Sequence, residues 1–297
     1  MENGTKRPKN PLAEVFGFPA DNLSPEAIRH RTLRLCPFGN IIPNCTKDKA
    51  NNPLGVCSIF DNEKVVITCP VRFRESWLIA EDAASFFFSK ESKWTSLSEV
   101  RLKDANGKSA GNIDIVLVSY DESGRVTDFG ALEVQAVYIS GNMRNPFERY
   151  MINHSSGDEF DWGEHANYPN PDYLSSSRKR LAPQLIFKGG IFQAWNKKLA
   201  VALNRGFFET LPKFGEVEPI EANIAWLVYD IEKNQNINRF VLHRHKIIFA
   251  KFDESLEKIT RSMPGDINVF INHLQKRINH LFENSTPPDN EKIDAPF

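Results

Sequence analysis

The sequence has no long hydrophobic run. Nowhere does it approach the ~18 consecutive apolar residues of a membrane-spanning helix, and its first residues, MENGTKRPKNPLAE, lack the apolar stretch of a secretory signal. We therefore expect a cytoplasmic protein with no membrane partner. Internal repeats and low-complexity tracts are also missing. A content of 41% hydrophobic and 25% charged residues is that of an ordinary globular chain.

An excess of positive charge is missing as well. The 37 Lys and Arg are balanced by 38 Asp and Glu, so the basic excess of many nucleic-acid-binding proteins is absent. Local charge differs, because no acid occurs between Asp172 and Glu209. This acid-free segment contains Arg178, Lys179, Arg180, Lys188, Lys197, Lys198 and Arg205. It forms either a solvated helix face or a surface that binds DNA phosphates, and the residues alone leave both interpretations open.

Cysteine is scarce, and all four cysteines fall within residues 1–75, which are rich in Pro, Asn and Gly: Cys36, Cys45, Cys57 and Cys69. This composition predicts an irregular, loop-rich N-terminal region. The spacing lacks the CxxC pairs of common zinc sites. In a cytoplasmic protein, clustered cysteines favour a four-thiolate metal site over disulfides. Four unlinked core thiols are the alternative.

The rest of the chain indicates alternating helices and strands. We expect an α/β (α+β) fold with a mixed central sheet flanked by helices in a domain at 76–284, followed by a flexible tail at 285–297. Helical spacing occurs at 77–88, at 175–199 with a possible break at Gly189-Gly190, and in a closing amphipathic helix at 266–284. Strand patterns occur between Glu99 and Ile139 and in ANIAWLVYDI and HKIIFAKF.

Two of the predicted strands carry a set of polar residues. Asp114 is followed after eighteen residues by Glu133-Val134-Gln135, the D…ExQ form of a nuclease pattern more often written D…ExK. Glu133 and Gln135 share one strand face because side chains alternate. Two carboxylates from adjacent strands suit Mg²⁺, which activates water for phosphodiester hydrolysis. The alternative is a carboxylate at an exposed position or in a salt bridge.

The motifs NIDIVLV and GALEVQAVYISGN, together with LCPFGN, GVC and TCP around the cysteines, resemble the NotI restriction endonucleases. The resemblance extends from Cys36 through SSSRKRLAPQLIFKGGIFQAWNKKL to AWLVYD. It implies a PD-(D/E)XK restriction-endonuclease-like core with an N-terminal four-cysteine metal-binding module. It also implies that Asp114 and Glu133 bind Mg²⁺, and that Gln135 stands where most relatives in the wider superfamily have lysine.

Further expectations follow from this resemblance. The four cysteines are expected to hold a structural iron, although thiolates also suit zinc. Glu99 is either a further acid of the catalytic site or a surface strand residue. The expected function is type II restriction, with hydrolysis of double-stranded DNA at a specific sequence that leaves 5′-phosphates. A homodimer is expected because palindromic sites match two-fold symmetry, and a cognate methyltransferase is expected in the host.

Two other functions fit the same residues. One is a repair-type or RNA-directed nuclease that uses the same core without a fixed site. The other is a non-catalytic, metal-stabilised DNA-binding protein whose strand acids form salt bridges. Cleavage that depends on Mg²⁺ separates the nucleases from the binding protein, and discrete fragments separate the two nucleases.

Overall fold

The structure is a computed structural model that describes residues 7–39, 42–49, 51–153 and 161–284. The chain divides into two compact units, residues 1–259 and residues 260–297. The expected boundary at residue 75 falls inside the first unit. The expected boundary at 284 falls inside the second.

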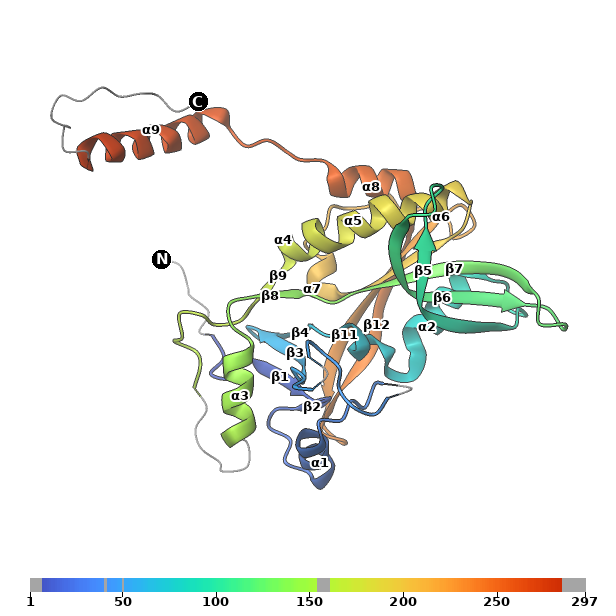
Figure 1. Cartoon of the computed structure of the whole chain (residues 1–297), viewed down its shortest axis with the longest axis horizontal. Coiled ribbons are helices and arrows are strands. Elements are labelled where there is room, and N and C mark those ends of the chain that lie inside the picture. Colours follow the sequence, from blue (N-terminus) through green and yellow to red (C-terminus); the bar gives the residue numbers. More distant parts are fainter. Residues whose placement is uncertain (1–6, 40–41, 50, 154–160, 285–297) are drawn as a thin grey trace. The chain divides into compact units, whose positions relative to one another are not determined.

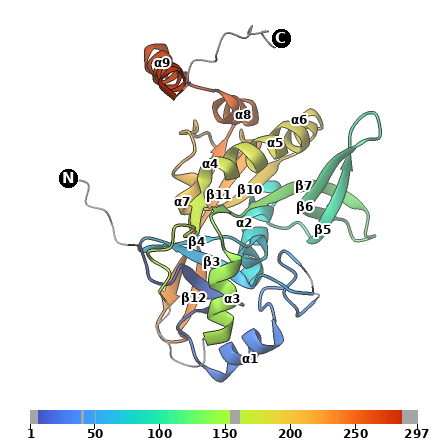
Figure 2. The same ribbon diagram turned by 60° about the vertical axis from the view of Figure 1, so that its left-hand side comes forward.

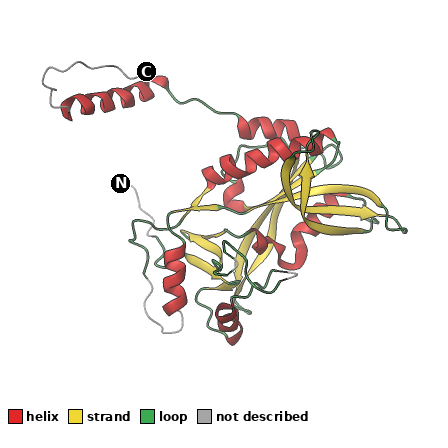
Figure 3. Cartoon of the chain, viewed as in Figure 1, coloured by secondary structure: helices red, strands yellow, loops and turns green. Residues whose placement is uncertain are grey.

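A six-stranded sheet runs through the first unit (Figure 3). Its strand order is β12-β11-β10-β7-β6-β5. Its strands are β5 (Trp94–Lys103), β6 (Ser109–Tyr120), β7 (Val126–Gln135), β10 (Leu199–Asn204), β11 (Ile224–Asn234) and β12 (Arg239–Ala250). The three central strands β7, β10 and β11 are parallel, and the other neighbours are antiparallel. The prediction of a mixed central sheet is thereby confirmed.

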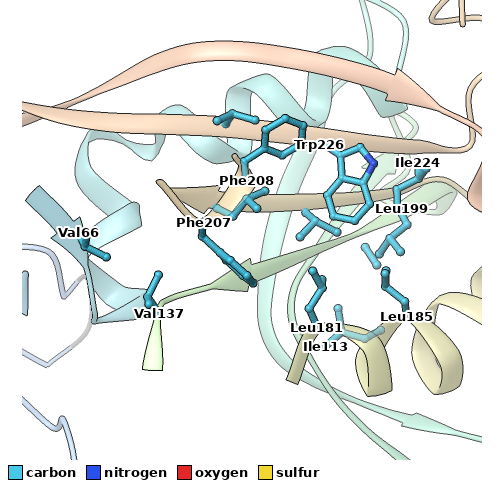
Figure 4. Packing of buried hydrophobic residues seen from close by; sticks show 14 of the residues in the cluster. Val66, Ile113, Val137, Leu181, Leu185, Leu199, Phe207, Phe208, Ile224 and Trp226 are labelled. Atoms are coloured by element: carbon cyan, nitrogen blue, oxygen red, sulfur yellow. The ribbon is translucent and has the colours of Figure 1, made fainter. Parts of the chain in front are cut away.

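Helices cover both faces of this sheet (Figures 1 and 2). On one face, α2 (Leu78–Phe87) packs Ile79 and Ala83 against Leu117 and Leu132. On the other face, Leu181 and Leu185 pack in one cluster with the sheet residues Ile113, Leu199 and Trp226 (Figure 4). Phe192 belongs to the same cluster. The helix α8 (Phe252–Thr260) contributes Phe252 to the same cluster. The flanking helices that the sequence predicts are therefore present.

The second covering helix runs from Tyr173 to Ala194. It consists of α4 (Tyr173–Ser176), π-helical turns at Ser177–Leu181, α5 (Ala182–Gln184), π-helical turns at Leu185–Gly189, and α6 (Gly190–Ala194). The predicted break at the two glycines does not occur, since both keep helical backbone angles. A Cβ on Gly189 would lie 2.5 Å from the Phe252 ring, so glycine permits close packing there.

The predicted extent of this helix to residue 199 is wrong. The helix ends at Ala194, and Leu199 begins β10, which lies between β7 and β11. A central parallel strand is buried on both faces and has a continuous apolar sequence without alternation. For this reason, the apolar run LAVALN has no periodicity that would distinguish a strand from the end of a helix.

The N-terminal region contains more regular structure than its loop-like composition predicts. The strands β1 (Leu12–Val15), β2 (Phe18–Pro19), β3 (Val56–Asp61) and β4 (Lys64–Ile67) form a four-stranded sheet, and α1 (Pro25–Leu33) follows β2. Arg72, in the 3-10 helix Pro70–Trp77, forms a buried ion pair with Glu14 of β1 at 2.9 Å. Arg72 also donates to the Phe240 carbonyl of β12 at 3.0 Å. One buried cation thus links the N-terminal sheet to the six-stranded sheet.

The remaining elements of the first unit are short. They are the two-stranded sheet of β8 (Tyr138–Ser140) and β9 (Asn170–Asp172), together with α3 (Arg144–Asn153) and α7 (Arg205–Phe208). The second unit contains α9 (Ile267–Asn284), which confirms the predicted C-terminal helix. The predicted tail at 285–297 lies outside the described residues. Among the described residues, no helix has the length and apolar character needed to cross a membrane.

Candidate active site

The register of β6 and β7 brings the two predicted carboxylates together. Ile115 pairs with Leu132, and one step further along this antiparallel register Asp114 lies opposite Glu133. Asp114 Oδ2 accepts a hydrogen bond from the Val134 N–H at 2.8 Å. Glu133 and Gln135 are both buried, with 2% and 1% of their surfaces exposed. Alternation along the strand therefore places the acid and the amide on one face, as the sequence indicates.

This polar face lies under the helix that runs from Tyr173 to Ala194. Lys188 is buried, and its Nζ lies 2.6 Å from Glu133 Oε2 and 2.8 Å from the Asn112 carbonyl oxygen. One turn earlier, Gln184 Oε1 accepts a hydrogen bond from Gln135 Nε2. The helix thus supplies a cation to the acid and an amide to the glutamine.

The electrostatic environment of Glu133 is unusual for a carboxylic acid. Burial, followed by the charge of Asp114, raises the pKa of Glu133 to about 8, while Lys188 acts in the opposite direction. Like charges placed side by side disfavour double ionisation. Strongly shifted carboxyl pKa values of this kind cluster at functional sites.

Two oxygen atoms of the site have no protein partner. Glu133 Oε1 and Gln135 Oε1 are buried and accept no hydrogen bond from the residues that the structure describes. Leaving a buried polar atom without a partner costs roughly 1–3 kcal/mol. Both oxygen atoms therefore have lone pairs to which a donor or a cation could bind.

Glu99 lies on the strand next to Asp114. Ser98 pairs with Ile115 and Val100 with Ile113, so Glu99 is opposite Asp114. Its backbone φ is +55°, an uncommon value for a residue other than glycine. Glu99 is exposed and lines a cavity of about 870 Å³. No hydrogen bond or ion pair joins it to Asp114 or Glu133 within the described residues.

The basic residues of the acid-free segment do not form one surface. Arg178, Lys179 and Arg180 are exposed, and Arg180 donates to the Tyr138 hydroxyl at 2.7 Å beside the same cavity. Lys188 lies inside the acidic site instead of on an exposed helix face. The others lie beyond the helix: Lys197 pairs with Asp128 at 2.6 Å, Lys198 donates to the Phe86 carbonyl, and Arg205 pairs with Glu209.

The four cysteines have free thiols, and Cys45, Cys57 and Cys69 are buried. Burial raises the pKa of Cys36, Cys45 and Cys57, with that of Cys45 reaching about 11, and the charge of Cys69 adds to the effect at all three. The thiols are therefore close enough to interact. However, the described residues contain no cluster of three or more His, Cys, Asp or Glu arranged to hold a metal ion.

The sequence predicts the acid pair and the glutamine, but not the contacts that Lys188 and Gln184 make with them. The sequence does show that Gln184 and Lys188 are four residues apart on a predicted helix, and this spacing places both side chains on one side of the helix. Nothing in that spacing identifies the strand that the helix covers. The sequence alone therefore assigns Lys188 to the same basic surface as its neighbours.

Comparison with known proteins agrees with this geometry. A mixed sheet with two facing carboxylates, covered by a helix that carries lysine, is an arrangement suited to a hydrolytic enzyme. A family model described as restriction endonuclease NotI matches residues 21–242, a range that includes the acid pair, Lys188 and all four cysteines. The chain belongs to the NotI restriction endonuclease family and is thus a nuclease that acts on DNA. No curated protein matches the chain.

Proposed function

We propose that this protein is a type II restriction endonuclease of the PD-(D/E)XK class that hydrolyses both strands of DNA at a specific sequence with Mg²⁺. The products are expected to carry 5′-phosphate and 3′-hydroxyl ends. The observation that carries the proposal is the position of Asp114 opposite Glu133, with the buried Oε1 atoms of Glu133 and Gln135 lacking protein partners.

The residues present fit a magnesium ion. Mg²⁺ prefers one or two carboxylates, with waters and phosphate oxygens completing its coordination. Asp114 and Glu133 would hold it, and Gln135 could orient the attacking water through its amide. When bound, the ion supplies Lewis-acid polarisation and an acidified water. Glu99 is a further candidate acid because it lies opposite Asp114 and faces the cavity.

Groups of the protein would exclude water from the site and hold the carboxylates and the amide in place. Burial of Glu133 and Gln135 excludes bulk water from the polar face, which strengthens electrostatic interactions there. The hydrogen bond from Val134 N–H fixes the Asp114 carboxylate. Gln184 fixes the Gln135 amide through its own side chain, so the carboxylates and the amide are positioned before DNA binds.

Digestion of a sequenced phage genome tests the proposal. We expect discrete fragments with Mg²⁺ and none with EDTA, and end mapping should identify one recurring site. Mg²⁺-dependent cleavage without discrete fragments would instead indicate a nuclease without a fixed site, as in DNA repair. Binding without cleavage at any Mg²⁺ concentration would indicate a metal-stabilised DNA-binding protein.

We also propose that Cys36, Cys45, Cys57 and Cys69 hold one structural iron or zinc ion. The support is their confinement to one region, the absence of disulfides and the mutual effect of the thiols on their pKa values. Four thiolates suit either metal. Binding of the ion would draw the four sulfur atoms together and contribute to folding of the N-terminal region.

DNA contacts are proposed for the basic residues, and those that are exposed are better candidates than those with protein partners. Arg178, Lys179 and Arg180 are exposed, and Arg180 lines the cavity. These three are the best placed to contact phosphates. Lys197 and Lys198 already have protein partners. Sequence-specific contacts would come from other surfaces, because phosphate contacts position DNA without selecting its sequence.

A homodimer is proposed, and α9 offers a surface for the second copy. Along this helix Ile267, Ile271, Leu274, Ile278 and Leu281 alternate at spacings of four and three residues. This is the heptad pattern of a coiled coil, with Ile at a and mainly Leu at d, which favours two parallel strands. Helices in proteins gain most of their stability from packing of an apolar face, and the apolar residues of α9 are exposed. Pairing with a second copy would stabilise it.

A further inference from the structure

The D…ExQ pattern leaves the strand without the lysine of the D…ExK pattern. Gln135 can orient a water or a phosphate, but it has no charge to oppose the negative charge that develops on the scissile phosphate. Its Nε2 is already engaged by Gln184. A cationic side chain at this site would therefore have to come from another element.

Resting on the proposed nuclease function, we infer that Lys188 supplies this missing charge from the covering helix and is a catalytic residue that contacts the scissile phosphate. Its Nζ lies 2.6 Å from Glu133 Oε2, so it occupies the acidic site itself. It is anchored to β6 by the Asn112 carbonyl at 2.8 Å. An ammonium group has three N–H donors, and the described residues accept two of them.

The position of Lys188 depends on the covering helix. Lys188 lies in the π-helical turns Leu185–Gly189, and Gln184 immediately precedes them. Gln184 contacts Gln135, and Lys188 contacts Glu133. Two side chains on one face of β7 thus meet two side chains that lie one turn apart on the helix. π-Helical turns are rare and occur frequently at functional sites. The amide and the charge thus come from different elements but meet on one face.

A purely structural role makes a different prediction. If Lys188 only neutralised buried Glu133, bound Mg²⁺ would take over that role, and lysine would be dispensable at saturating metal. If Lys188 opposes charge on the phosphate, its loss should slow cleavage even at saturating Mg²⁺. The rate constant at saturating Mg²⁺ therefore separates the two roles.

The test uses the full-length Lys188→Met variant in single-turnover cleavage at saturating protein and Mg²⁺. We expect a rate about 100-fold or more below that of the parent, the effect of removing one preorganised transition-state contact. Without DNA, calorimetric titration should show Ca²⁺ binding at least as tight as in the parent, because a competing cation has gone. The matched control is Lys233→Met, which removes a 2.7 Å pair with Asp21 outside the site. This control should cut at the parental rate.

A second experiment places a lysine on β7, at the position where the D…ExK pattern has it. Gln135→Lys in the Lys188→Met background should recover at least tenfold of the lost rate. The inference is overturned if Lys188→Met cuts DNA at a rate within threefold of the parent rate. It is also overturned if loss of folding or of Ca²⁺ binding accounts for the slower cleavage. A double variant that is no faster than Lys188→Met would overturn it as well. A parent protein that cuts no DNA would instead refute the proposed function.

Discussion

Lys188 and Glu133 are 55 residues apart in the chain, and their side chains meet at 2.6 Å inside the protein. Each is almost fully buried, with side-chain exposures of 8% and 2%. A buried ion pair is costly to form and more costly to break from one side. The pair lies beside a second carboxylate, Asp114, which raises the pKa of Glu133 further. So costly an arrangement is weak evidence for a stabilising role.

The acid pair should be essential for cleavage and dispensable for folding. Asp114→Ala and Glu133→Ala are expected to lower the cleavage rate by several orders of magnitude, because either change removes a proposed Mg²⁺ ligand. DNA binding in Ca²⁺, measured by gel shift, should persist. Glu122→Ala is the control, since this acid lies in the turn between the same two strands and pairs with exposed Lys93. Cleavage by either alanine variant at the control rate would contradict the assignment.

The pH dependence of stability should reveal Glu133. Its pKa is about 8 in the folded protein, against an ordinary value of 4.5, so the folded state binds this proton more tightly than the unfolded state. Its contribution to stability is fully present below pH 4.5 and is lost as pH rises towards 8. Glu133→Gln cannot titrate, so the parent should become less stable relative to this variant between pH 5 and pH 8.

Urea unfolding in EDTA at these two pH values measures that difference. EDTA is needed because a bound cation would favour the ionised acid. A stability difference between parent and Glu133→Gln that does not change with pH would mean that Glu133 has an ordinary pKa in the folded protein.

The exposed end of the basic segment should dominate DNA affinity. Arg178→Ala and Lys179→Ala are expected to weaken binding to all sequences alike and to flatten the salt dependence by about one unit of slope per contact. Lys197→Ala should have a smaller effect because Asp128 already neutralises Lys197 at 2.6 Å. Fluorescence anisotropy in Ca²⁺ across a salt series measures both quantities. If Arg178→Ala and Lys179→Ala bind as the parent does, this end of the helix is a solvated surface.

The cysteines should bind one metal ion per chain. Cys→Ser at Cys36, Cys45, Cys57 or Cys69 is expected to lower both metal content and melting temperature, since loss of one ligand weakens the whole site. Elemental analysis distinguishes iron from zinc, and Glu133→Ala is the control that should keep the metal. Four thiols that react freely in the folded protein, or metal-free protein with unchanged stability, would refute the site.

The heptad stripe of α9 should control self-association. Leu274→Asp with Ile278→Asp places charges in the a and d positions, and we expect the dimer to dissociate at micromolar concentration. Sedimentation equilibrium measures the change, and Lys276→Asp on the opposite side of the helix is the control. A doubly substituted protein that remains dimeric would place the interface elsewhere. A monomeric parent would refute the proposed homodimer.

Local sequence pattern accounts for the part of the site formed by one hairpin. Alternation along 109–120 and 126–135 predicted both strands and placed Glu133 beside Gln135 on one face. The turn between them sets the register that brings Asp114 opposite Glu133. These are short-range effects, because each residue's direction follows from its position in the strand.

The sequence by itself therefore determined the acidic hairpin, the class of fold and the resemblance that the family match supports. Only the tertiary structure decided that Leu199–Asn204 is a central strand and that Lys188 closes the acidic site while Lys197 and Lys198 do not. The physical reason is that helical periodicity specifies which residues share a face, but the surface covered by that face is chosen by packing of Leu181, Leu185 and Phe192 on distant strands. The local sequence does not distinguish a lysine on a solvated helix face from a lysine paired with a buried acid, because only that packing separates them.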